Sequence, residues 1–101
     1  MGTRLELHKV LSDILGSTNV YYQPPNNTTM KYPAIVYSRS DIVNDHADNN
    51  VYIQSLEYEL TVIDRNPDSE IVKKVAMLPL CSFDRHYTAN NLNHDIFTIY
   101  Y

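Results

Sequence analysis

The most constraining feature of this sequence is the stretch VYIQSLEYELTVID, residues 51–64, in which apolar and polar side chains alternate. A period of two places successive side chains on opposite faces of a β-strand. One face carries Tyr52, Leu56, Tyr58, Leu60 and Val62, with Gln54 as its exception, and the other carries Val51, Ser55, Glu57, Glu59 and Thr61. One apolar and one polar face is typical of an antiparallel sheet covered on one side, because a parallel strand covered on both sides is apolar throughout.

Two segments have the pattern of helices. Residues 3–15 begin with a capping box, Thr3-x-x-Glu6, and are followed by Gly16, which suits the left-handed residue after a helix. The apolar positions of this first helix recur at helical spacing and are Leu7, Val10, Leu11, Ile14 and Leu15. His8 flanks that stripe and is expected to be a solvated helix residue.

The second helix is expected to start at Asn66 as N-cap, with Pro67 at its first position, and to end at Pro79. Its apolar face would be Ile71, Val72, Val75 and Leu78. Further β-prone runs lie at 20–22, 32–38, 81–87 and 95–101. The first of these runs must be an edge or entry strand, because Pro24 and Pro25 stop it.

Two polar segments separate the later strands. Residues 41–50, DIVNDHADNN, hold three aspartates, three asparagines and a histidine and are predicted to form a loop, and residues 88–93 are predicted to form a hairpin turn. The order is therefore α-β-β-β-α-β-β. We predict a single α+β domain over residues 1–101, with a mostly antiparallel β-sheet and two helices packed on one face.

Composition excludes several classes of protein. A single cysteine, Cys81, forbids an internal disulfide and a thiolate zinc site, so packing or association with other subunits must stabilise a small core. The net charge of −4 disfavours binding to nucleic acid, and two glycines cannot form a glycine-rich phosphate loop. Nine tyrosines without a tryptophan suit strand faces and protein interfaces. No apolar run is long enough to span a membrane, and the acidic start argues against a signal peptide, so we expect a cytosol-like compartment and no membrane partner.

The stretch from Cys81 to Asp95 gathers a thiol, two imidazoles and two carboxylates, and so resembles an active site. Regular alternation would put Cys81 on one strand face and His86 on the other, so the two are expected to point apart and Cys81 to be buried or half-buried. A hairpin could bring Asp84 or His86 near His94 as metal ligands, but the spacing matches no specific metal signature.

The loop acids Asp45 and Asp48, with His46, could bind a divalent cation weakly, yet they lack the glycine and the final glutamate of an EF-hand. We therefore assign no catalytic residue, no metal ligand and no cofactor. A small metal-dependent hydrolase stays open as an alternative function.

The run YELTVIDRNPDSEIVKKVAMLPLCSFDRHYTANNLNHDIFTIYY, residues 58–101, together with MKYPAIVYSRSD, residues 30–41, resembles the small tail terminator proteins of long-tailed bacteriophages. These are also called tail completion or head-tail joining proteins. The resemblance implies a structural virion protein rather than an enzyme. It also implies a ring of six copies that caps the tail tube and docks on the head connector, with DNA only passing through the ring. The protein would be made in the cytoplasm of a bacterial host and would lie in the virion at the junction of head and tail.

The resemblance also implies where the subunit makes contacts. Residues 41–50 match a long polar loop between two strands, which would contact a neighbouring subunit or the tail tube protein. The contact residues expected there are Asp41, Asn44, Asp45, His46, Asp48, Asn49 and Asn50, and Asn90 and Asn91 in the hairpin turn form a second expected contact. A neighbouring head-completion or stopper protein of the connector is the closest alternative role.

Overall fold

The structure is a computed structural model that describes residues 3–25, 28–47 and 50–101. Within residues 42–55 only the backbone is described, and elsewhere in these ranges the side chains are described as well. It contains two helices and five strands: α1 (Arg4–Leu15), β1 (Val20–Tyr22), β2 (Ala34–Ala47), β3 (Asn50–Asp64), α2 (Glu70–Ala76), β4 (Cys81–Ala89) and β5 (Leu92–Tyr100). The predicted α+β class and the predicted order of elements are confirmed. In this part of the chain no helix is long and apolar enough to cross a membrane.

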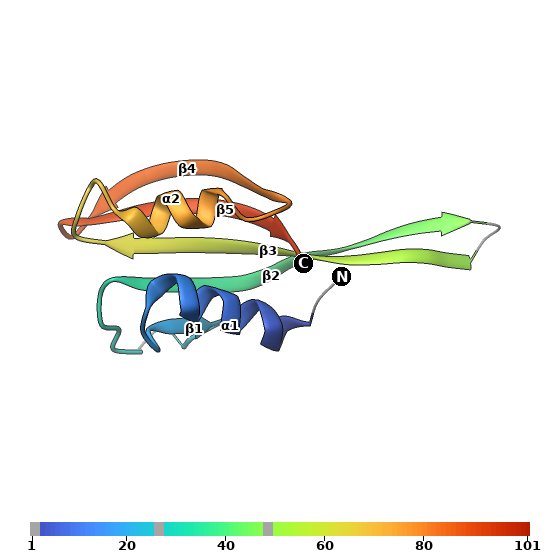
Figure 1. Cartoon of the computed structure of the whole chain (residues 1–101), viewed down its shortest axis with the longest axis horizontal. Helices are drawn as coiled ribbons and strands as arrows, with labels where there is room; N and C mark the ends of the chain where they lie inside the picture. Colours follow the sequence, from blue (N-terminus) through green and yellow to red (C-terminus); the bar gives the residue numbers. More distant parts are fainter. Residues whose placement is uncertain (1–2, 26–27, 48–49) are drawn as a thin grey trace.

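The five strands form one sheet in the order β1-β2-β3-β5-β4. Only the short edge strand β1 runs parallel to its neighbour β2, and the other pairs are antiparallel. The antiparallel β2–β3 and β4–β5 pairs are hairpins, and α2 connects β3 to β4. Figure 1 shows both helices on the same side of this sheet.

The core lies between the helices and one face of the sheet. Residues directly opposite each other across a ladder share a face, and Tyr58, Leu60 and Val62 of β3 stand opposite apolar residues of β2 or β5. The fully buried side chains of this core are Leu7, Leu11, Ile35, Tyr37, Tyr58, Leu60, Val62, Val75, Phe97 and Ile99. The other side of β3 carries the partly exposed Glu57, Glu59 and Thr61, so the predicted division of β3 into two faces is confirmed over the residues whose side chains are described.

Helix α1 begins and ends where its sequence predicts. The Thr3 hydroxyl accepts a hydrogen bond from the Glu6 amide at 3.2 Å, and Gly16 closes the helix with φ 76° while its amide donates to the Ser12 carbonyl at 2.9 Å. Leu7 and Leu11 are fully buried, so the predicted stripe faces the sheet.

Helix α2 starts later than its sequence predicts. Asn66 is not the N-cap: its side-chain oxygen accepts from the Asp68 amide at 3.0 Å in a turn before the helix. Ser69 caps α2 instead, accepting from the Ile71 amide at 3.3 Å, and it is 5% exposed. The helix ends at Ala76, before Pro79. The apolar face is as predicted, with Val75 buried and Ile71, Val72 and Leu78 packed against the core.

The β4–β5 hairpin is longer and tighter than predicted. Its strands reach Ala89 and Leu92, which leaves Asn90 and Asn91 as the two-residue connection. Both have positive φ, 53° and 63°, which is the backbone of a type I′ turn and suits asparagine. Residues 88–93 therefore contain the turn as expected, but four of the six belong to strands.

The closure of α1 gives a stability prediction. A Cβ added at Gly16 meets nothing within 4 Å, so the only cost of Gly16→Ala is the free energy of holding an alanine in the left-handed backbone conformation. We expect a loss of about 1 kcal/mol in the free energy of unfolding, measured by urea denaturation. Gly16→Asn is the matched control and should lose less, because asparagine tolerates this conformation better than alanine. Equal losses for both variants would show that the conformation is not the cause.

Candidate functional site

The strands β2 and β3 continue as a two-stranded arm beyond the rest of the sheet. We define the arm as residues 41–47 and 50–56. Strand β1 pairs only with Ile35–Tyr37, and β5 pairs with β3 only from Glu57 onward, so within the described residues the two arm strands pair only with each other. Figure 1 shows the arm projecting away from the helices. The radius of gyration, 14.6 Å, exceeds the value of about 13 Å expected for a compact chain of this length.

The predicted loop at residues 41–50 is wrong for most of its length. β2 runs on to Ala47 and β3 begins at Asn50, with Ile42 opposite Leu56 and Asn44 opposite Gln54. Aspartate and asparagine have low β-propensity, which is why the segment reads as a loop. Its pairing partner, residues 50–56, is rich in β-branched and aromatic residues, and pairing with this segment stabilises the polar segment as a strand.

The expected contact residues of this segment divide between two groups. Asp41, Asn44, Asp45, His46 and Asn50 lie in the strands of the arm, whereas Asp48 and Asn49 lie outside the described residues. Among the arm residues in this set, only the side chain of Asp41 is described, and it is exposed. The proposed Asp45-His46-Asp48 cation site lies outside the described side chains.

Polar contacts fix the base of the arm, where it joins the rest of the sheet. The ladder register shifts between Arg39 and Asp41, so Ser40 is an extra residue that forms a β-bulge. Its hydroxyl donates to Glu57, at 2.8 Å from Oε1 or 3.2 Å from the backbone carbonyl. A hydrogen bond from Tyr100 to the Glu57 carboxylate raises the pKa of Tyr100, and the Tyr101 amide donates to the Leu56 carbonyl at 3.0 Å. The C-terminal residues therefore hold the base of the arm, and the bulge sets its direction.

The second expected contact, Asn90 and Asn91, lies at the opposite end of the sheet. Asn93, just after that turn, pairs with Asp64 at the end of β3, while the arm contains the beginning of β3. Fourteen residues of strand separate Asn50 from Asp64, a length of about 45 Å at 3.3 Å per residue. The two segments therefore lie at opposite ends of the sheet and form two separate candidate contacts.

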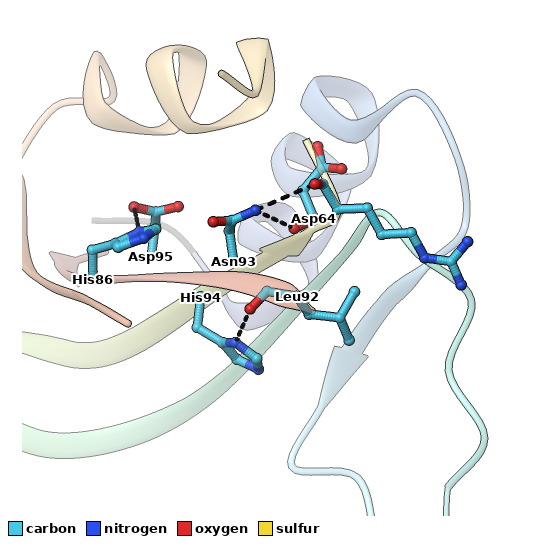
Figure 2. Close-up of polar contacts among 7 residues, drawn as sticks. Asp64, His86, Leu92, Asn93, His94 and Asp95 are labelled. Carbon is cyan, nitrogen blue, oxygen red and sulfur yellow. Dashed lines mark hydrogen bonds and ion pairs between the residues drawn. The ribbon is translucent and has the colours of Figure 1, made fainter. Parts of the chain in front are cut away.

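The reactive side chains of the β4–β5 hairpin are divided between the two faces of the sheet. Nδ1 of His86 lies 2.8 Å from Oδ1 of Asp95, its cross-strand partner. His94 points to the other side of β5, where its Nδ1 lies 3.2 Å from the Leu92 carbonyl and its ring stacks on Tyr87 with centroids 4.6 Å apart. Figure 2 shows His86 and Asp95 on one side of the strand and His94 on the other. His86 and His94 are thus not brought together.

A second β-bulge corrects the prediction that Cys81 and His86 point apart. The register shifts at Asp84, so Cys81 pairs with Ile99 and His86 with Asp95, two residues of β5 that share one face. The extra residue reverses the alternation halfway along β4. The two side chains still do not meet, because four residues of β5 separate their partners, or about 13 Å. Among the described residues no group of three histidine, cysteine, aspartate or glutamate side chains could hold a metal ion.

Two groups of polar contacts are not predicted by the sequence. Asn93 is the second residue of β5, and its side-chain amide donates to the backbone carbonyls of Asp64 and Arg65 at 3.2 and 3.3 Å, which holds the end of β3 (Figure 2). His8 is not a solvated helix residue: its Nδ1 lies 2.7 Å from the hydroxyl of the buried Tyr37. Arg4 lies over the Tyr22 ring, 4.5 Å from its centroid, and its guanidinium reaches the same Tyr37 hydroxyl at 3.5 Å. The i, i+4 spacing of Arg4 and His8 was the available signal.

No protein-family model, no curated protein and no solved structure matches this chain.

Burial of Cys81 predicts slow thiol chemistry. Desolvation raises the pKa of the Cys81 thiol above its ordinary value of 9.0, so the thiolate fraction is smaller in the folded protein than in the unfolded chain. Iodoacetamide should therefore alkylate the native protein more slowly than the urea-unfolded protein at the same pH, as followed by mass spectrometry. Faster alkylation of the native protein would instead identify an activated nucleophile.

The buried tyrosines predict instability at alkaline pH. Desolvation raises the pKa of Tyr37 and Tyr58 above 10.0, an effect that Arg4 partly offsets at Tyr37. Because the folded pKa is the higher one, this stability is fully present below a pH of about 10 and is lost as the pH rises through the folded values. Melting temperatures measured from about pH 8 upward should stay level to about pH 10 and then fall, and the fall should be smaller in a Tyr37→Phe/Tyr58→Phe variant.

The matched control is Tyr87→Phe, at a tyrosine that is 45% exposed. It should follow the pH profile of the unmodified protein. A double variant whose melting temperature falls as steeply as that of the unmodified protein would contradict the assignment to Tyr37 and Tyr58.

Proposed function

We propose that this protein is a structural subunit of a bacteriophage tail, of the tail terminator kind. Copies of the chain form a closed ring, expected to contain six subunits, that caps the tail tube protein and joins it to the head connector. It acts by binding rather than by catalysis, without a cofactor or metal ion, and DNA only passes through the ring. Its place is in the virion, at the junction of head and tail.

The observation that carries this proposal is the arm. A two-stranded ribbon is at best marginally stable in water, because it has no third strand or helix against which to bury side chains. Bonds at Ser40, Glu57 and Tyr101 hold its base, and beyond that base the described ladder joins its two strands only to each other. An element of this kind gains its stability from another molecule, which suits a subunit that works only when assembled.

The side chains that looked reactive also support a binding role. His86 is paired with Asp95, His94 is stacked on Tyr87, and Cys81 is half-buried with a raised pKa. The segment 40–64 holds six acidic residues and no lysine or arginine. Such an acidic segment suits a ring through which DNA moves, because it would not retain the phosphates.

Removing the arm tests the proposal. In the deletion variant, residues 43–55 are replaced by Asn-Gly, so that a type I′ turn joins Ile42 to its ladder partner Leu56. We expect the variant to keep its cooperative unfolding, because no residue of the described core is deleted, but to lose ring formation and binding to tail tubes. Light scattering after size exclusion, negative-stain imaging and co-sedimentation with purified tail tubes measure these properties.

A charge control accompanies the deletion. Asp45→Asn removes one charge from the arm, and Asp13→Asn removes one from the exposed side of α1; only the first should alter assembly. A chain that stays monomeric and binds neither tail tubes nor connector components would contradict the proposal. Binding to the portal side alone would identify the neighbouring head-completion or stopper role instead.

A further inference from the structure

Strand β4 forms a long open edge of the sheet. It is the last strand in the order β1-β2-β3-β5-β4, and within the described residues nothing pairs with its outer side. Eight of its nine residues are exposed. The other edge strand, β1, is only three residues long and stops before Pro24. An edge of nine residues presents a row of backbone donors and acceptors to which a strand from another molecule can be added.

Apolar side chains accompany this open edge. Met77 is 85% exposed, Leu80 73% and Phe83 56%, and we call these three residues the 77–83 patch. These three are among the five large apolar side chains that are exposed in the described structure, and they lie within seven consecutive residues. The Phe83 ring packs edge-on against the ring of Phe97, with the two centroids 5.5 Å apart. Exposed apolar side chains gathered in this way mark an interaction surface.

Leu80 is strained as well as exposed. It has φ 56°, a left-handed conformation that glycine or asparagine adopts at lower cost, and its carbonyl is fixed by the Tyr100 amide at 3.1 Å. A leucine that is mostly in solvent contributes little to the core of its own subunit. Backbone strain that no contact within the subunit compensates is expected at a position where the side chain binds another molecule.

Charge and geometry point to the arm of a second copy as the partner. Residues 41–57 hold four acidic residues and no lysine or arginine, whereas residues 65–89 hold four basic and three acidic residues. Lys73 and Lys74 lie one helical turn before Met77, and Lys74 makes no ion pair with any described residue. The one acid and the one base of β4, Asp84 and Arg85, pair with each other at 2.6 Å, so the edge itself is neutral, and Lys74 lies on α2, which contacts β4. Two arms would repel each other, whereas this edge would not repel an arm.

The arm cannot reach the β4 edge of its own subunit, because it leaves the sheet from β2 and β3 and points away from β4 (Figure 1). We propose that the outer edge of β4, with the 77–83 patch, binds the arm of a second copy as an added strand. This inference rests on the proposed function and names the contact that builds the ring. Each copy then offers one arm and one β4 edge, a head-to-tail arrangement that can close into a ring.

Disulfide trapping between two different variants tests this contact. Both variants carry Cys81→Ala. One also carries Ser82→Cys on exposed β4, and the other carries Asn44→Cys or Gln54→Cys, which are ladder partners on opposite strands of the arm. We expect the mixed disulfide to predominate over either homodisulfide after mild oxidation, and the better of the two arm positions identifies the strand that pairs with β4. Raising the salt concentration should reduce the yield.

Two substitutions separate association from folding. Leu80→Gly should weaken self-association about tenfold or more, because it removes a buried leucine from the interface, while it leaves the melting temperature unchanged or raises it. Met77→Ser should likewise weaken association. Leu5→Ser, at a leucine of α1 that is 69% exposed, is the matched control and should change neither property.

The outcomes distinguish this inference from the proposed function. A dominant homodisulfide through Ser82→Cys would show that two β4 edges pair symmetrically and would overturn the inference, as would the absence of any mixed disulfide. Rings that cap tail tubes normally when Leu80 and Met77 are substituted would overturn the inference and leave the proposed function standing. A mixed disulfide in a protein that binds no tail or connector component would support the inference and refute the proposed function.

Discussion

The ladder between β2 and β3 is the interaction on which the rest of the structure depends. Over its inner part it aligns Ile35 with Val62 and Tyr37 with Leu60, which places four large side chains on the face that the helices cover. A shift of one residue would turn these side chains to the opposite face, and both helices would lose the surface on which they pack. Over its outer part the same ladder is the only described structure of the arm. One set of backbone hydrogen bonds therefore builds both the core and the projecting element.

Two of the three register shifts in the described ladders adapt this sheet at its two ends. The extra residue Ser40 lies where β2 leaves the core and becomes the arm, and Glu57 holds it there. The extra residue Asp84 lies in the middle of the open strand β4 and determines which side chains face the helices. A bulge bends and twists its strand, so each gives the sheet a local direction that alternation alone cannot provide.

The sequence predicted the local elements well and their extensions poorly. The cap at Thr3, the closure at Gly16 and the two faces of β3 follow from contacts within a few residues, and each lies where it was predicted. The Asn66 cap was wrong because Ser69 also suits an N-cap, and a choice between two suitable residues depends on how the helix packs. The 41–50 segment has a low β-propensity of its own and therefore predicts a loop, whereas its strand character comes from pairing with residues that lie later in the chain.

The candidate contact residues show the same division. The asparagines at 90 and 91 could be assigned to a turn because two positive φ angles favour that residue type. That this turn lies at the far end of the sheet from the arm, and that His86 shares a face with Cys81, could not be read from spacing. The sequence predicts neither the open β4 edge nor the strained Leu80, because exposure depends on which strands have neighbours.

The α+β class, the order of elements and the apolar sides of β3 and of each helix can be predicted from the sequence, since they follow from periodicity and from end signals that act over one or two turns. The register and its shifts, the length of the arm and the identity of the open edge appear only in the folded chain. These depend on cross-strand pairing between residues distant in the chain, where one inserted residue reverses the face of every side chain that follows.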